Sequence, residues 1–159
     1  MTDFLWRSLV IGIGGTAAMD VWAFILNAVF GVALPNWGFV GRWFAHLGKG
    51  AFFHDDIAKA SPAANEAAFG WFMHYAIGIF YAAVLIWLAG PEWLLAPTFL
   101  PAWIAGLVTV GAGWFILQPG MGAGWAASRR ANPWKIRMLN IIFHTVFAAG
   151  LYGTALLIA

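Results

Sequence analysis

An aspartate in the middle of the first long apolar stretch is the residue whose chemistry most needs an explanation. Asp20 stands within the run GGTAAMDVWAF, far from either end of that stretch. Placing an aspartate at the centre of a bilayer costs about 2.5–3.5 kcal/mol on insertion scales, so such a group usually faces protein or water and often marks a functional site. Two interpretations stay open: a proton or cation site, or a buried anchor held in a fixed ion pair or hydrogen bond.

Two histidines in later apolar stretches, His74 and His144, are the expected companions of this carboxylate. Three interpretations stay open: core histidines with satisfied hydrogen bonds, members of a proton or ion pathway with Asp20, or ligands of a metal or haem. Haem is included because bis-histidine ligation requires two histidines on different helices. Helical periodicity adds neighbours on the same faces. The predicted polar intramembrane site comprises Asp20, His74, His144, Asn140, Tyr81 and Tyr152. No catalytic residue, cofactor or standard metal-site spacing is identified.

The composition indicates an integral membrane protein. Of the 159 residues, 63% are hydrophobic and only 9% are charged, and the mean hydropathy is +0.82. Soluble domains carry about 25% charged residues. There is no cysteine, which excludes disulfides and thiolate metal sites, and a formal charge of +2 is too small to indicate nucleic acid. We expect a single all-α transmembrane domain covering residues 1–159.

Four membrane-spanning helices are predicted, at about residues 4–33, 62–89, 98–118 and 133–158. Ser61-Pro62 and Asn132-Pro133 each resemble an N-cap residue followed by proline at the first helical position, which marks the starts of the second and fourth helices. Between the first two helices, residues 37–59 interleave aromatic and charged side chains. This mixture favours one or two short helices lying in the membrane interface.

The second and fourth predicted helices share an order of residue types: a cap residue, a proline, a histidine and a tyrosine. Pro62 lies nineteen residues before Tyr81, and Pro133 lies nineteen residues before Tyr152. This internal repeat predicts a four-helix bundle made of two tandem helical hairpins, with its two histidines at similar depth.

Lysine and arginine are unevenly distributed among the connectors. Glu92 is the only charged residue of the second connector, whereas the first and third connectors are basic. The positive-inside rule therefore predicts that connectors one and three are cytoplasmic and that both termini are periplasmic. The basic residues are Arg42, Lys49 and Lys59 in the first, and Arg129, Arg130, Lys135 and Arg137 in the third.

A glycine-rich stretch in the third connector has two interpretations. Gly122 and its neighbours could expose backbone amides to an anion beside Arg129 and Arg130, and a lipid phosphate would be the expected anion. Alternatively, the stretch is a tight turn that allows close packing, and the arginines only set the topology.

Several short motifs are distinctive together: GTAAMDVW, GRW at Gly41–Trp43, HYAIG at His74–Gly78, QPGMGAGWAASR at Gln118–Arg129, and His144 followed by GLYG at Gly150–Gly153. With these motifs the chain resembles the bacterial membrane family catalogued as domain of unknown function 2938, over nearly its whole length. The resemblance implies an inner-membrane location and no assigned activity, so no residue role is carried over.

The leading hypothesis is therefore a small multi-pass membrane protein whose internal Asp/His site binds or conducts a proton, an ion or a small solute. One alternative is a non-catalytic subunit of a larger membrane complex, and another is a haem- or metal-binding redox protein. Whether the protein is an enzyme stays open. The expected partners are membrane lipids and either further copies of the chain or a larger membrane complex, and not nucleic acid.

Overall fold

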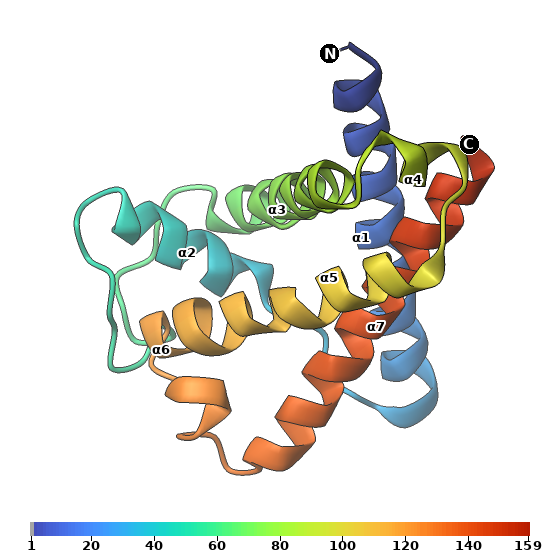
Figure 1. Cartoon of the computed structure of the whole chain (residues 1–159). Coiled ribbons are helices and arrows are strands. Elements are labelled where there is room, and N and C mark those ends of the chain that lie inside the picture. Colours follow the sequence, from blue (N-terminus) through green and yellow to red (C-terminus); the bar gives the residue numbers. More distant parts are fainter. Residues whose placement is uncertain (1) are drawn as a thin grey trace. The chain divides into compact units, whose positions relative to one another are not determined.

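The computed structural model describes residues 2–159, and this part of the chain is helical with no strand (Figure 1). The long helices are α1 (Thr2–Phe30), α3 (Glu66–Ala89), α5 (Phe99–Ala112) and α7 (Pro133–Leu157). Between and after them lie α2 (Trp37–Leu47), α4 (Pro91–Leu95), the π-helical turn η1 (Gly113–Leu117), α6 (Gln118–Gly120) and the 3₁₀ turn η2 (Trp125–Ala127).

Four of these segments are long and apolar enough to cross a membrane. They are Thr2–Phe30, Glu66–Ala89, Phe99–Gly120 and Pro133–Leu157, which confirms the predicted all-α fold with four spanning helices. Large apolar side chains cover their outer faces; Trp87, for example, is 74% exposed and Phe24 is 55% exposed. Such faces suit a hydrocarbon environment, because lipid leaves no reason to bury them.

The predicted helix start is correct for the fourth span and wrong for the second. At α7, Asn132 Oδ1 accepts the backbone N–H of Lys135 at 3.1 Å, as expected of an N-cap. The second span begins at Glu66 rather than Pro62, because the Glu66 carboxylate accepts the backbone N–H of Ala63 at 2.8 Å and holds the preceding turn non-helical. The two histidines are consequently not equally far from their helix starts, and the repeat stays a prediction.

The third span continues past its predicted end at residue 118 to Gly120 because the helix widens. Pro119 has no backbone N–H, and a proline ring inside an α-helix clashes with the carbonyl four residues earlier. The chain responds with the π turn η1, in which the N–H of Gln118 bonds to the carbonyl of Gly113. Such π turns occur frequently at functional sites.

The chain divides into two compact units. Unit 1 comprises Met1–Leu34, Tyr75–Thr109 and Ile141–Ala159, and unit 2 comprises Pro35–His74 and Val110–Asn140. The boundaries fall inside α3, α5 and α7, so each of these helices contributes to both units.

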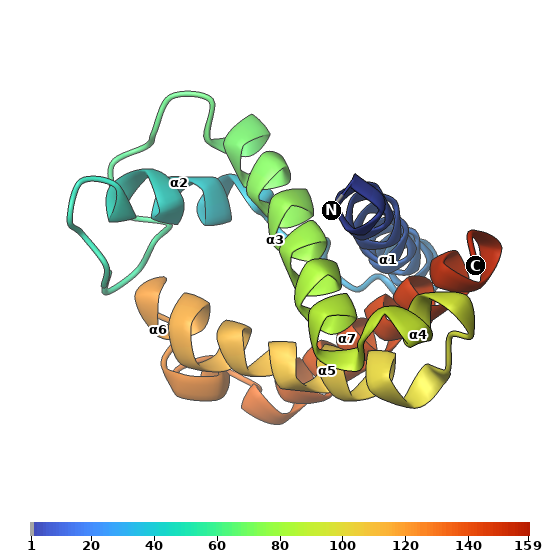
Figure 2. The same ribbon diagram turned by 45° about the horizontal axis from the view of Figure 1, so that its top comes forward.

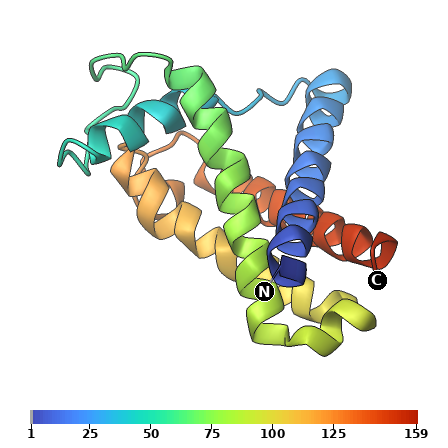
Figure 3. The ribbon, with the colours of Figure 1, turned by 90° about the horizontal axis from the view of Figure 1, so that it is seen from above.

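Unit 1 is built on close approaches between small residues. A Cβ on Gly12 of α1 would collide with the backbone of Ile79 on α3, and a Cβ on Gly150 of α7 would lie 2.8 Å from the Cα of Gly15. Glycines at helix contacts let backbones meet closely in this way. Figures 1 and 3 show α1 crossing α7.

Unit 1 also contains a hydrophobic core. Its buried members come from α1, α3, α4, α5 and α7, and α4 lies beside the C-terminal end of α7 (Figure 2). Arg7 closes this end by donating from its guanidinium to the carbonyl of Ile158 at 2.8 Å. The core comprises Ile11, Ala82, Leu85, Ile86, Trp93, Leu94, Ala102, Phe147, Leu151 and Ala155.

In unit 2, α2 lies beside the first turns of α3. Asn36 caps α2 by accepting the N–H of Phe39 at 3.4 Å. A Cβ on Gly41 would collide with the backbone of Glu66, and one on Gly70 would collide with that of Trp37. The predicted short helix in the first connector is therefore present, and its place in the membrane interface stays a prediction.

Candidate functional site

In unit 1 the carboxylate of Asp20 is hydrogen-bonded to Tyr75. The hydroxyl of Tyr75 on α3 donates to Asp20 Oδ2 on α1 at 2.9 Å. The local sequence explains the contact. Thr16 Oγ1 donates to the carbonyl of Gly12 on its own helix at 2.8 Å, and Gly78 on α3 has no Cβ that would collide with Thr16. The two helices therefore meet closely one turn before Asp20, which brings Tyr75 within reach of the carboxylate.

Tyr75 is the residue that the sequence analysis missed at this position. It directly follows His74 in the HYAIG motif, and it lies three residues before Gly78 on the same helix. Because residues three apart share a helix face, a tyrosine three residues before a glycine at a helix contact could have indicated the partner of Asp20. A tyrosine hydroxyl both donates and accepts, so it keeps a hydrogen bond with the carboxyl group whether that group is ionised or protonated.

His144 on α7 is held by α5, also in unit 1. Its Nδ1 lies 3.0 Å from Thr109 Oγ1 and 3.2 Å from the carbonyl oxygen of Gly106. Thr109 itself donates to that carbonyl at 2.8 Å, so both oxygens face Nδ1 as acceptors and the hydrogen of the neutral ring is assigned to Nδ1. The nitrogen with the lone pair is then Nε2, which is the position where this ring would take up a proton.

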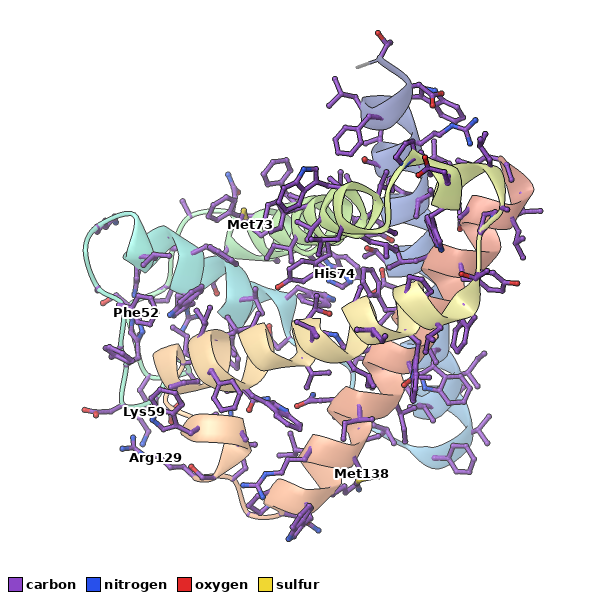
Figure 4. The ribbon with its side chains drawn as sticks, in the orientation of Figure 1. Phe52, Lys59, Met73, His74, Arg129 and Met138 are labelled. Carbon is purple, nitrogen blue, oxygen red and sulfur yellow. The ribbon has the colours of Figure 1, made fainter. Side chains whose placement is uncertain are left out.

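His74 lies in unit 2, between aromatic rings. It stacks on Trp37, with ring centroids 3.8 Å apart and an interplanar angle of 24°, and meets Trp71 edge-on at 5.9 Å. Figure 4 labels it on α3. A histidine stacked in this way has its ring plane fixed by packing.

Asn140 belongs to a different polar cluster of unit 2. Its Oδ1 accepts hydrogen bonds from Trp114 Nε1 at 3.0 Å and from Gln118 Nε2 at 2.9 Å. The two predicted tyrosines lie in unit 1, where Tyr81 and Tyr152 pack against the hydrophobic core. Of the predicted site, unit 1 holds Asp20, Tyr81, His144 and Tyr152, and unit 2 holds His74 and Asn140. Their assembly into one constellation stays a prediction.

The glycine-rich turn of the third connector packs against the first connector. The N–H of His54 donates to Gly120 O at 2.9 Å, and the N–H of Ile57 donates to Met121 O at 3.1 Å. Gly122 has a φ of +89°, and a Cβ there would collide with the carbonyl of Asp55. Glycine is therefore required at 122 both by its conformation and by the approach of the other connector.

The predicted anion contact at this turn stays a prediction. The amide of Gly122 donates to the carbonyl of Pro119 at 3.1 Å, so this N–H is engaged within the turn. Arg129 and Arg130 are exposed, and Figure 4 labels Arg129 in the turn of unit 2.

Arg42 organises the first connector, a role that the sequence analysis did not foresee. Its side chain is buried and binds both carboxylate oxygens of Glu66, at 2.9 and 2.7 Å. The remaining guanidinium nitrogen donates to three carbonyls, those of Ile57, Ala58 and Ala60. The hydrogen bonds that Arg42 donates to Glu66 raise the pKa of Arg42, so the guanidinium stays charged. The sequence showed Arg42 only as one positive charge among several.

Two histidines of the connector form a hydrogen-bonded chain. His46 Nδ1 lies 2.9 Å from His54 Nε2, and His54 Nδ1 lies 3.0 Å from the carbonyl of Gly120. Since a carbonyl only accepts, the hydrogen of His54 is assigned to Nδ1, and His46 donates to its Nε2. Over residues 2–159, no group of three or more His, Cys, Asp or Glu side chains is placed to hold a metal ion.

Comparison with known protein families gives one finding. Residues 9–158 match the family model described as protein of unknown function, DUF2938. No curated protein and no solved structure matches the sequence.

Proposed function

Since the chain belongs to the DUF2938 family of proteins of unknown function, we propose its function from the contacts of its own residues: a membrane protein that binds a proton at Asp20 and lets it cross the bilayer. The proposal rests on one observation, the 2.9 Å hydrogen bond between Tyr75 and Asp20 within helices apolar enough to span a membrane.

The Asp20–Tyr75 pair is suited to taking up and releasing a proton. When Asp20 is ionised, the hydroxyl of Tyr75 donates to Asp20 Oδ2, which is the hydrogen bond of 2.9 Å in the structure. When Asp20 is protonated, its own O–H can donate to the tyrosine oxygen, so neither state leaves a polar group without a partner. The pair therefore keeps its hydrogen bond through both the uptake and the release of a proton.

His144 provides a second proton-exchanging group in unit 1. With Nδ1–H directed at Thr109 and Gly106, protonation takes place at Nε2 and leaves these hydrogen bonds intact. An acidic and a basic group in one set of apolar helices is the arrangement that membrane proton relays use. Asp20 is the carboxylate of the proposed path, and His144 is its base.

We expect Asp20→Asn to lower proton flux through the protein by at least about tenfold, because the amide can neither release nor accept a proton at this position. The measurement is proton entry into liposomes that contain the purified chain and a pH-sensitive dye, driven by a potassium diffusion potential. Tyr75→Phe should retain flux at a lower rate, since it removes the hydrogen bond but keeps the carboxyl group.

Asp3→Asn is the matched control. Asp3 lies on the same helix, but it is exposed and bonded to Trp6 and Arg7. It should behave like the unmodified protein. Equal flux from the Asp20 and Asp3 variants would contradict the proposal, and so would a flux no greater than that of empty liposomes for the unmodified protein.

We also propose that the protein lies in the bacterial inner membrane with connectors one and three in the cytoplasm. The basic residues of these connectors support this orientation. Because the chain has no cysteine, single cysteines report topology cleanly. An impermeant maleimide should label Glu92→Cys in intact spheroplasts and Lys59→Cys only after permeabilisation, since both positions are exposed. The reverse labelling pattern would overturn the orientation.

A further inference from the structure

A cluster of neutral polar side chains at the end of the third span plays no part in the proposed proton site. Trp114, Gln118 and Asn140 meet in unit 2, where the oxygen of Asn140 accepts from the other two at 3.0 and 2.9 Å. Trp114 lies within the π turn η1, Gln118 directly follows this turn, and Asn140 comes from α7.

The two donors fix the orientation of both amides. Trp114 Nε1–H can only donate, so the atom of Asn140 that faces it is the oxygen. The atom of Gln118 that faces this oxygen must then be its nitrogen, because two carbonyl oxygens would repel each other. Gln118 Oε1 is consequently turned away from Asn140.

This orientation leaves a buried acceptor unused. Among residues 2–159, Gln118 Oε1 is one of two buried side-chain atoms without a hydrogen-bond partner. Both described hydrogen bonds of Asn140 end on its oxygen, so its amide N–H groups stay available as donors. The cluster therefore offers one open acceptor and one open donor on adjoining amide groups.

The charges around the cluster indicate what it would bind. All three side chains are neutral, and the cation Arg137 lies one helical turn before Asn140, with its Nε donating to the carbonyl of Ala126 at 2.8 Å. A nearby fixed positive charge disfavours a second cation. The ligand must also donate to Gln118 Oε1 while accepting from Asn140, which an anion without an N–H or O–H cannot do, so a neutral group fits best.

We propose that the cluster of Trp114, Gln118 and Asn140 is a binding site for a small neutral solute that carries a carboxamide group. A carboxamide presents an N–H donor and a carbonyl acceptor on one planar group, which complements the open acceptor and donor of the two amides. The indole N–H of Trp114 orients the amide of Asn140 and does not itself bind the solute.

Gln118 is the only glutamine in the chain, which makes a direct test available. Protein labelled with glutamine carrying ¹³C at Cδ and ¹⁵N at Nε gives a single carboxamide signal by NMR in detergent micelles. Titration with acetamide should move this signal in a saturable way with half-saturation in the millimolar range, as befits so small a ligand. N,N-dimethylacetamide has the carbonyl but no N–H, and it should cause at least a tenfold weaker response.

Variants separate binding from solvent effects. Asn140→Leu removes the partner amide and should abolish saturation, whereas Asn27→Leu, which alters an exposed asparagine of unit 1, should leave it unchanged. If Asn140→Leu fails to fold, the comparison of acetamide with N,N-dimethylacetamide on the unmodified protein still tests whether a carboxamide binds. A linear response to both compounds, or no response to acetamide, would overturn the proposal and leave water as the partner of Gln118 Oε1.

Discussion

Replacing Arg42 with alanine is expected to destabilise unit 2 by about 2–3 kcal/mol. The substitution removes the bidentate pair with Glu66 and the donors to three carbonyls at once. Breaking a buried ion pair by removing one partner costs about 3–5 kcal/mol, and the side chain of Glu66 is 22% exposed, so water recovers part of this loss. Chemical denaturation in mixed micelles gives the change in the free energy of unfolding.

Arg42→Lys should recover little of this stability, because one ammonium group cannot replace a planar fork that serves both a carboxylate and backbone oxygens. Lys59→Ala is the control: Lys59 pairs with Asp56 at 3.7 Å, its side chain is 85% exposed, and its loss should cost at most about 0.5 kcal/mol. Equal effects of Arg42→Ala and Lys59→Ala would show that Arg42 does not hold the connector.

The second large effect is expected at Gly12, where alanine should destabilise unit 1 by about 3 kcal/mol or more. Overpacking typically costs about 1–3 kcal/mol. Here the added methyl group would meet the backbone of α3 at Gly78 and Ile79, which cannot move aside as a side chain can. The measurement is again the free energy of unfolding in mixed micelles.

Gly153→Ala is the matched comparison, since it makes the same change within a helix. No atom lies within 4 Å of a Cβ at Gly153, so only the greater helix propensity of alanine acts, and a gain of about 0.5–1 kcal/mol is expected. Opposite signs for the two substitutions would confirm that the glycine of GIGG is required by close packing. The same sign for both would contradict it.

The four spanning helices could be predicted because hydropathy and length alone determine them, and the cap at Asn132 is a purely local signal. The start at Pro62 could not, because what ends the non-helical segment is the Glu66 carboxylate, and this carboxylate is held by Arg42, which lies 24 residues earlier in the chain. A contact between distant residues overrode a favourable local pattern.

Asp20 could be identified as exceptional from its type and position, but its partner could not. Periodicity measured from the predicted helix starts favoured Tyr81 and Tyr152, which pack against the core, whereas Tyr75 is selected by the close contact at Gly78. Sequence spacing along one helix does not reveal which face meets its neighbour when every face is apolar.

Gln118 shows the same limitation in a polar setting. Its unpaired acceptor follows from the two hydrogen bonds that fix Asn140. Neither is visible in the sequence, in which Gln118-Pro119-Gly120 indicates only the end of a helix.

The central claim is that Asp20 takes up a proton within the membrane, and infrared difference spectroscopy tests it most directly. Spectra of the protein in lipid bilayers, recorded as the pH is changed, should contain a protonated carboxyl band that shifts when aspartate is labelled with ¹³C. This band should be absent from Asp20→Asn and shifted in Tyr75→Phe, which loses the hydrogen bond to Asp20 Oδ2. A carboxyl band that is the same in the unmodified protein and in Asp20→Asn would contradict the claim.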